Sequence, residues 1–501
     1  MTISGVSSNL SPLIQSALDI NKQLDDLNQQ LGTGLKADTY AGLGTQGGVA
    51  VALNSQLSAI NSYDGTMTTV GTTLSLQQQV LQQIASVGST VQTTAGQPDF
   101  TLDNTGQTSQ QEAAANQLDA VLSALNTQGG NGYLFSGLGV NQAAVDTADH
   151  ILNGNGAQAG LEQVIAERLQ ADQGADGLCR LVISAPTTTS LSVAEDAANS
   201  PFGLKLASVN STLTNATVSG PTGSPPAISV DMSGGNPNDG DTISFAFNLP
   251  DGTTQTVQLQ ATTATSPGAN QFAIGATPAA TEANLQAALT AAVTNIGQTT
   301  MPAASAVAAS DNFFDDPPQR VNGAPATATS LVNGTPANTV FWYTGDNSAA
   351  SIRSTATARV GSATTVSYGT QANEQGIRTI VQNIATLAAT TYSASDPNAS
   401  ASYNALTSRL YTNLSFPSGT QNITDIEASL ANAQTVIQST QAQNQQTSNM
   451  LTNMLQSIQN ADQTQVGAEI LSLQTSLSAS LSATARMAQL NLVTYLSPVT
   501  G

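Results

Sequence analysis

This 501-residue chain has very little of the side-chain chemistry that most enzymes and metal sites use. It contains one cysteine, one histidine and one tryptophan, namely Cys179, His150 and Trp342. A single cysteine excludes an intrachain disulfide and a thiolate metal cage, and a single histidine excludes a two-histidine zinc motif. A Cys179–His150 dyad is formally open, but no nucleophile motif surrounds Cys179, so a small buried side chain is favoured. We expect no catalytic residue, no metal and no cofactor.

Carboxylates are the one catalytic residue type that the chain has in quantity. Asp239 with Asp241, and Asp315 with Asp316, form acidic pairs that could serve catalysis or bind Ca²⁺. Neither pair has the spacing of a known calcium loop, and both lie among turn residues. We therefore favour solvated turns at both places, although catalysis by carboxylates alone stays open.

Basic residues are also scarce. The chain has 11 Lys and Arg against 32 Asp and Glu, which gives a formal net charge of -21. Such a field repels phosphate groups, so we expect neither nucleic acid nor an anionic membrane as a partner. No apolar run reaches the length of a membrane span, and the first residues lack the basic and apolar regions of a signal peptide. The many Thr, Ser, Asn and Gln are nevertheless typical of a secreted, extracellular protein.

Aromatic residues make up only 4% of the chain, whereas hydrophobic residues in total make up 40%. Burial must therefore come from many small aliphatic contacts, which suits long packed helices. The N-terminal region has apolar residues at alternating spacings of three and four, the heptad pattern of a coiled coil. The members of this N-terminal stripe are Leu10, Leu13, Ala17, Ile20, Leu24, Leu27 and Leu31.

A second stripe of the same kind lies near the other end of the chain. The members of this C-terminal stripe are Val466, Ile470, Leu473, Leu477, Leu481, Thr484, Ala488, Leu492 and Tyr495. A narrow apolar stripe cannot be buried by its own helix, so each helix needs a partner. We predict an assembly interface made by the fourteen aliphatic members of the two stripes.

Between the ends, the apolar period changes from that of helices to that of strands. Ile243, Phe245 and Phe247 alternate with polar residues, and residues 250–252 (Pro-Asp-Gly) predict the turn of a hairpin that returns through Val257 and Leu259. Thr277-Pro278 predicts the start of a helix that carries Leu285, Leu289 and Val293. The dense aromatic segment at residues 341–343 favours a buried strand over a stacking site.

We therefore expect a mainly α fold, in which both termini form a long antiparallel α-helical coiled-coil stem that bears an inserted β-rich (α+β) outer domain. The expected domains are a terminal coiled-coil core domain over residues 1–32 and 465–501, a helical stem domain over 33–149 and 372–464, and the outer domain over 150–371.

Several segments resemble the flagellin family of bacterial flagellar axial proteins. Residues 30–36 (Gln-Leu-Gly-Thr-Gly-Leu-Lys) lie where that family breaks its first helix. Residues 130–137 (Gly-Asn-Gly-Tyr-Leu-Phe-Ser-Gly) and the ending at 487–496 are similar to the hook–filament junction protein, a close relative of flagellin. Residues 240–288 resemble an outer domain of alphaproteobacterial flagellins. One departure is the run after Lys36, Ala-Asp-Thr-Tyr-Ala-Gly-Leu-Gly, so filament contacts cannot be transferred there.

The resemblance implies a structural subunit of the bacterial flagellum that self-assembles into the filament and supports motility. It also implies export through the flagellar type III route without a cleaved signal, with an export chaperone, hook-associated proteins and a cap as partners. The first alternative is the hook–filament junction protein of the same family. A flagellum-displayed adhesin or enzyme and an unrelated secreted coiled-coil translocator are further alternatives. The absence of a membrane-spanning apolar hairpin disfavours the translocator.

Overall fold

The computed structural model describes residues 7–130, 132–346, 348–349 and 351–495. Its secondary structure is a mixture of helix and strand, about 52% and 17% of the chain. The expectation of long helices combined with a β-rich region is met at this level. The chain divides into two compact units. We call Met1–Thr69, Ala358–Thr365 and Thr435–Gly501 the terminal unit, and Val70–Thr357 with Val366–Gln434 the central unit.

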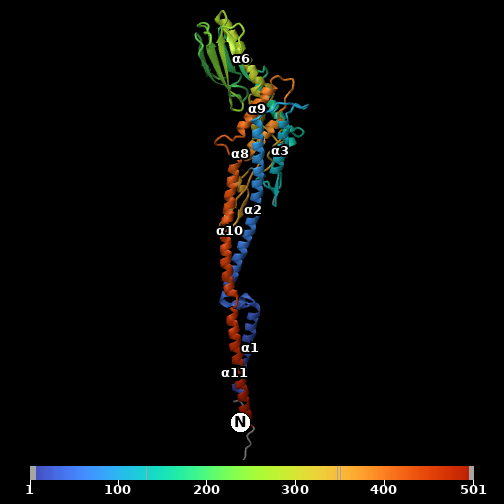
Figure 1. Ribbon diagram of the computed structural model, residues 1–501, viewed down its shortest axis with the longest axis vertical. Helices are drawn as coiled ribbons and strands as arrows, with labels where there is room; N and C mark the ends of the chain where they lie inside the picture. The colour runs from blue at the N-terminus through green and yellow to red at the C-terminus, as the bar shows by residue number, and fades with distance from the viewer. Residues whose placement is uncertain (1–6, 131, 347, 350, 496–501) are drawn as a thin grey trace, which may run out of the picture. The chain divides into compact units, whose positions relative to one another are not determined.

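The terminal unit consists mainly of helices from the two ends of the chain (Figure 1). Within it α1 and α11 lie side by side, and the structure ends α1 at Thr33, as residues 32–34 (Gly-Thr-Gly) predict. The helices α2 and α10 each contribute residues to both units. The elements are α1 (Ser7–Thr33), the 3-10 helix η1 (Tyr40–Gln46), α2 (Gly47–Ala95), α10 (Ile423–Gln459) and α11 (Gln463–Tyr495).

The central unit contains two four-stranded sheets. In the first sheet the strand order is β3-β4-β7-β6, and in the second it is β10-β9-β8-β5. All neighbours are antiparallel except β9 and β10, which are parallel. The strands are β3 (Leu181–Thr187), β4 (Ser190–Glu195), β5 (Lys205–Ser211), β6 (Thr217–Thr222), β7 (Ala227–Asp231), β8 (Thr242–Asn248), β9 (Thr254–Thr262) and β10 (Gln271–Ala273).

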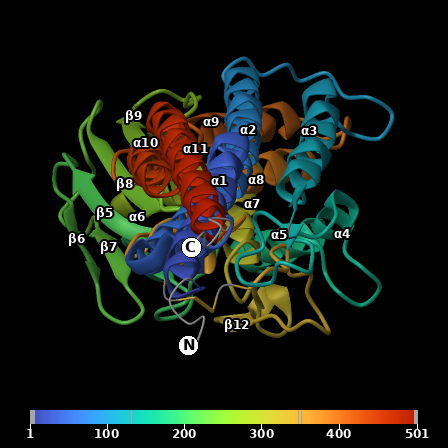
Figure 2. The same ribbon diagram turned by 90° about the horizontal axis from the view of Figure 1, so that it is seen from below.

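The predicted hairpin is confirmed, because β8 and β9 pair in unbroken register from Thr242–Gln260 to Asn248–Thr254. The predicted helix is confirmed as α6 (Pro278–Gln298), capped by the Thr277 side chain, which accepts a hydrogen bond from the Ala280 N–H. Both sheets and α6 share one apolar core, and Figure 2 shows the strands β5 to β9 grouped with α6. Core members include Leu191, Val193, Ile228, Val230, Phe245, Phe247, Leu285 and Leu289, all fully buried.

The rest of the central unit is mostly helical. Its helices are α3 (Ser109–Leu125), α4 (Ala148–Asn153), α5 (Leu161–Gln173), α7 (Thr300–Phe313), α8 (Gln375–Ala389) and α9 (Ala399–Asn413). The helix α7 contacts α5, α8 and α9. The expected outer domain includes α5 and α7, and the expected stem domain includes α8 and α9. In the structure these four helices pack together in one unit.

Short elements complete the central unit and its border. The strands β1 and β2 pair antiparallel, with Gln128 opposite Tyr133 and Gly129 opposite Gly132. Trp342 and Tyr343 are buried, as expected, but the predicted strand at 341–343 is wrong. Trp342 lies in a loop instead. Its indole N–H donates a hydrogen bond to the Phe314 carbonyl at 3.2 Å, which fixes the buried ring. The short elements are β1 (Gln128–Gly129), β2 (Gly132–Tyr133), β11 (Gln319–Val321), η2 (Pro325–Thr327), β12 (Leu331–Asn333), η3 (Ile352–Thr355), β13 (Thr357–Arg359) and β14 (Thr365–Ser367).

Candidate assembly interface

Two backbone hydrogen bonds join the segment that follows α1 to the end of α10 and to the short link between α10 and α11. The Lys36 N–H donates to the Gln459 carbonyl at 2.7 Å, and the Ala461 N–H donates to the Gly34 carbonyl at 2.9 Å. The Lys36 ammonium adds a bond to the Ser457 carbonyl at 2.8 Å. Gly34 has a φ of 72°, which favours glycine over a residue with a side chain. Since α1 ends where α11 begins, the two helices run antiparallel from this junction.

Near the junction the two stripes meet. Leu24, Val466 and Ile470 form a small buried cluster, in which each side chain is at most 8% exposed. Other apolar side chains pack on the cluster while half-buried, as expected where one stripe lies along another. These are Ile20, Leu27, Ala461, Leu473 and Leu477.

The structure thus brings together seven of the fourteen predicted interface residues, and it adds Ala461. The other seven do not join the cluster. Ala17 is half-buried on α1, while Leu31 and Leu481 are 41% and 56% exposed. The remaining members lie on α1 and α11, but their side chains fall outside the part that the structure describes. They are Leu10, Leu13, Ala488 and Leu492.

A second set of apolar side chains lies off the stripes. Ile14 and Leu18 are one helical turn apart on α1, and they are 54% and 55% exposed. At 3.6 residues per turn they lie on a different face from Leu24. Leu471 on α11 is 67% exposed, although its neighbour Ile470 is buried. Neither predicted stripe includes this set, although the four-residue spacing of Ile14 and Leu18 indicates a second apolar face on α1.

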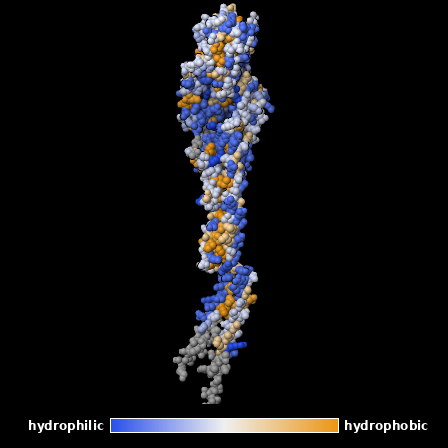
Figure 3. Space-filling view, turned by 90° about the vertical axis from the view of Figure 1, so that its left-hand side faces the viewer, coloured by the Kyte–Doolittle hydropathy of each residue, from blue (hydrophilic) through white to orange (hydrophobic). Residues whose placement is uncertain are grey.

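Exposed apolar side chains are concentrated in the terminal unit. Of the 18 large hydrophobic side chains that are exposed among the described residues, 13 belong to it, although it holds 144 of the 501 residues. In Figure 3, apolar patches lie among hydrophilic areas in the lower part of the surface. Two helices of 27 and 33 residues bury three large side chains between their described parts. Patches of exposed apolar surface mark sites of protein association.

The candidate dyad is not supported by the surroundings of its two members. Cys179 is fully buried in the core of the two sheets, and burial raises the pKa of its thiol to about 12, with the Asp172 and Asp176 carboxylates adding to the shift. His150 is on α4, where its Nδ1 lies 2.9 Å from the Asp146 carboxylate. A thiol that stays protonated is a poor nucleophile.

The acidic pairs serve turns, as expected. The Asp241 carboxylate accepts hydrogen bonds from the backbone N–H and the hydroxyl of Thr214, at 2.9 and 2.7 Å, and these bonds lower the pKa of Asp241. Asp239 accepts the Thr263 N–H at 2.7 Å, and Asp315 accepts the Asp316 N–H at 3.0 Å. Among the described residues, no three His, Cys, Asp or Glu side chains gather closely enough to hold a metal ion.

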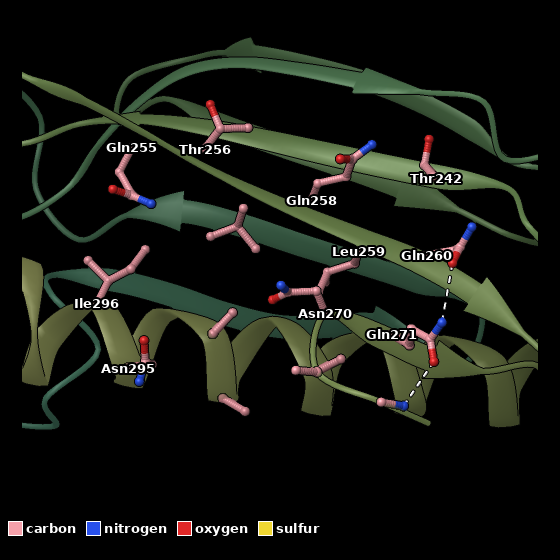
Figure 4. A pocket seen from close by; sticks show the side chains of 16 residues that line it. Thr242, Gln255, Thr256, Gln258, Leu259, Gln260, Asn270, Gln271, Asn295 and Ile296 are labelled. Atoms are coloured by element: carbon pink, nitrogen blue, oxygen red, sulfur yellow. Dashed lines mark hydrogen bonds between the residues drawn. The ribbon is translucent and has the colours of Figure 1, made fainter. Parts of the chain in front are cut away.

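The central unit has a groove of about 940 Å³ whose polar lining suits hydrogen bonding rather than acid–base chemistry. It is lined by residues of β9 and α6 and by the segment before β10 (Figure 4). Its polar groups are amides and hydroxyls, such as Gln258, Asn270, Asn295 and Thr256, and no Asp, Glu, His, Lys, Arg or Cys lines it. Such a lining has no group that could exchange a proton near neutral pH.

No known protein family and no curated protein matches this chain. Among the described helices, none combines the length and the hydropathy needed to cross a membrane.

Proposed function

We propose that this protein is a structural axial subunit of the bacterial flagellum, which is secreted and self-assembles through α1 and α11 into the extracellular filament. The observation that carries the proposal is the apolar surface left on the paired terminal helices. Leu471 and Leu481 on α11, and Ile14 and Leu18 on α1, are more than half exposed. Neighbouring copies would cover these side chains, and the gain of buried apolar area drives the assembly.

In this proposal α1 and α11 form an antiparallel coiled-coil stem, and the central unit carries the β-rich outer part. The family resemblance at residues 30–36 supports this arrangement, because the helix break there coincides with the hydrogen-bonded junction of Gly34 with Ala461. The partners are other copies of the chain, hook-associated proteins and the cap, with a type III export chaperone before secretion. The proposed subunit is not an enzyme and uses no cofactor.

The hook–filament junction protein of the same family is the second candidate function. The observation that favours it is the segment at residues 130–137, whose sequence is similar to that protein. In the structure Gly132 and Tyr133 form β2, and Phe135 is fully buried. The alternatives of a displayed adhesin or enzyme lack such a local feature, since the groove beside β9 carries no titratable side chain.

Deletion of the gene from its bacterium tests the proposal. We expect cells that keep their hooks, lose their filaments and do not swim, and we expect the wild-type gene to restore all three properties. Normal filaments in the deletion strain would contradict both candidate functions.

Copy number then separates the two candidates. Quantitative immunoblots of isolated appendages should find thousands of copies for a filament subunit and on the order of ten for a ring at the junction. In addition, a junction role predicts that flagellin monomers leak into the medium of the deletion strain, whereas a filament role predicts no such leak.

A further inference from the structure

The strand β9 has one side that is only partly paired. On its first side it pairs with β8 from Thr254 to Gln260. On its second side β10 covers it only from Gln260 to Thr262. Between Thr254 and Leu259 no strand within the described residues pairs with this second side. We call this open stretch, residues 254–259, the β9 edge.

The hydrogen bonds at the end of β9 show which residues face the β9 edge. The Ala261 N–H donates to the Asp241 carbonyl on the β8 side, at 2.8 Å. The Gln260 N–H donates to the Asn270 carbonyl on the opposite side, at 2.9 Å. Backbone groups alternate between the two sides of a strand in an antiparallel ladder. The residues whose N–H and C=O groups point to the β9 edge are therefore Thr254, Thr256 and Gln258.

The groove of about 940 Å³ runs along the β9 edge. Residues 255–260 of β9 line one side of it, and Ala288, Ala291 and Ala292 of α6 line the other side (Figure 4). Because an alanine side chain ends at Cβ, this face of α6 leaves room for the side chains of an added strand. Proteins bind extended peptides by adding them as a strand to an exposed sheet edge.

The β9 edge lacks the usual protection against such pairing. Natural proteins protect an edge strand with a charge, a proline or a bulge. Residues 254–259 contain neither a charged residue nor a proline, and their pairing with β8 shows no bulge. The β9 edge is therefore a ready template for an extended segment.

The two faces of β9 set the side-chain pattern of a segment that fits there. Val257 and Leu259 are 7% and 1% exposed in the core that β9 shares with α6, whereas Thr256 and Gln258 are exposed on the opposite face. An added strand continues this alternation. Every second side chain of the segment then lies against the alanines of α6, which favours aliphatic residues, and the side chains between them lie in solvent.

Charge indicates which residues stand between the aliphatic ones. Residues 206–319, which include β8, β9, β10 and α6, contain eight Asp and Glu and no Lys, Arg or His. Asp239 and Asp241 flank Gly240, whose carbonyl accepts a hydrogen bond from the Gln260 side chain at 3.4 Å, at one end of the groove. Hydrogen bonds from Thr214 lower the pKa of Asp241, so this carboxylate stays ionised at neutral pH. Such a surface repels another copy of the chain and attracts a basic segment.

We propose that the β9 edge binds an extended segment of another protein, in which aliphatic residues alternate with lysine or arginine, as an added strand. The backbone of the segment bonds to the N–H and C=O groups that point to the edge. Its aliphatic side chains pack on α6, and its basic side chains lie in solvent in the field of the surrounding carboxylates. A single copy of the chain forms the whole groove, so this inference does not depend on the proposed polymer.

Binding of a synthetic peptide to the soluble full-length chain tests the inference. The probe is an end-capped, fluorescently labelled peptide of roughly eight residues in which valine and lysine alternate. We expect saturable binding by fluorescence anisotropy, which weakens as the salt concentration rises. The same peptide with glutamate in place of lysine should bind at least about tenfold more weakly, because the central unit repels it.

Two backbone-methylated versions of the peptide test strand addition on the unchanged chain. Methylation of the backbone nitrogen of every lysine, or of every valine, removes the N–H groups from one edge of the peptide only. One version should bind at least about tenfold more weakly than the parent peptide, since it loses the hydrogen bonds to β9. The other version should bind as the parent does, because its methyl groups point away from β9.

Substitutions at Thr256 test the place of binding. Thr256→Pro removes an N–H that points to the β9 edge and none from the ladder with β8, so it should weaken binding by about tenfold, whereas Thr256→Ala should not. Thr256→Lys should also weaken binding, because it repels the lysines of the peptide. Asn210→Lys, at an exposed residue of β5 in the same sheet, is the matched control. The melting temperature of each variant shows whether it folds.

Three results would overturn the inference. Equal binding of the two methylated peptides excludes strand addition, and equal binding of the glutamate peptide excludes a basic partner. A dimer of the chain that Thr256→Pro abolishes, and that Leu471→Gln does not, assigns the β9 edge to a second copy instead. The proposed function is tested separately by the deletion strain, so its failure and the failure of this inference are distinguishable.

Discussion

The terminal and central units use apolar residues in opposite ways. The central unit contains the eight largest fully buried aromatic side chains, and all six ion pairs that Arg or Lys makes among the described residues. The terminal unit holds most of the exposed large hydrophobic side chains instead. The central unit completes its core by itself, whereas the terminal unit leaves apolar surface for other molecules.

Charge separates the two units in the same direction. The terminal unit has 7 acidic and 4 basic residues, a net charge of -3, and the central unit has 25 and 7, a net charge of -18. A high net charge keeps a surface soluble and monomeric, while a surface close to neutral associates more easily. Association between copies is therefore expected at the terminal helices.

The largest effect is expected from a charge in the core of the central unit. Leu249 is 4% exposed and packs in the core that both sheets share with α6. Leu249→Asp places a carboxylate there without a partner, so we expect the free energy of unfolding of the monomer to fall by more than about 3 kcal/mol. Thermal and urea unfolding of the soluble chain measure the change. An unchanged melting temperature would contradict the assignment of this core.

A smaller effect is expected from the exposed residues of α11, and it should act on polymerisation rather than on the stability of the monomer. Leu471→Gln combined with Leu481→Gln should leave monomer unfolding unchanged, because both side chains are more than half exposed. If neighbouring copies bury Leu471 and Leu481 in the polymer, each substitution removes about 1.5–3 kcal/mol of apolar burial free energy per subunit. The critical concentration for polymerisation should then rise by roughly tenfold or more for each substitution. Val332→Gln, at a side chain of the central unit that is 47% exposed, is the matched control.

The Cys179 thiol reports the state of the central unit without any substitution. Burial raises the pKa of Cys179 from 9.0 to about 12, so at pH 8 the native chain holds about a thousandfold less thiolate than the unfolded chain. Because the folded pKa is the higher one, this contribution to stability is complete below pH 9 and is lost as the pH rises towards 12. Reaction with a chromogenic disulfide should be slow in native protein and fast in urea.

The same thiol reaction compares the two units directly. Leu249→Asp should speed the reaction of Cys179, because the two residues belong to the same core. The double substitution at Leu471 and Leu481 should not change the rate. A faster reaction in the α11 variant would show that the terminal helices support the central core.

Local patterns predicted some elements of the central unit because their causes are local. The alternation of Ile243, Phe245 and Phe247 predicts β8, since one face of that strand is buried and the other is not. Thr277-Pro278 predicts the start of α6, since the Thr277 hydroxyl caps the helix within three residues.

Other elements escaped sequence reasoning because their causes are not local. Residues 303–310 of α7 are all buried, so the helix has no polar face and no visible period. The parallel pairing of β10 with β9 depends on contacts after a loop, which alternation cannot show. At the candidate interface the stripes predicted Leu24 with Val466 and Ile470. They could not show that Leu31 and Leu481 stay exposed, since that depends on where each helix meets its neighbour.

The most direct test of assembly through the terminal helices is polymer yield measured beside monomer melting for Leu24→Asp. Leu24 lies in the cluster with Val466 and Ile470 and is 8% exposed. A charge there leaves the α1–α11 pair without its apolar contact, and every subunit of the polymer repeats that loss. We predict no sedimentable polymer for Leu24→Asp, while the melting temperature of the central unit in its monomer stays within about 2 °C of wild type, because Leu24 is not part of the core that both sheets share with α6. Wild-type polymer yield, or a monomer that melts as early as Leu249→Asp, would contradict the account.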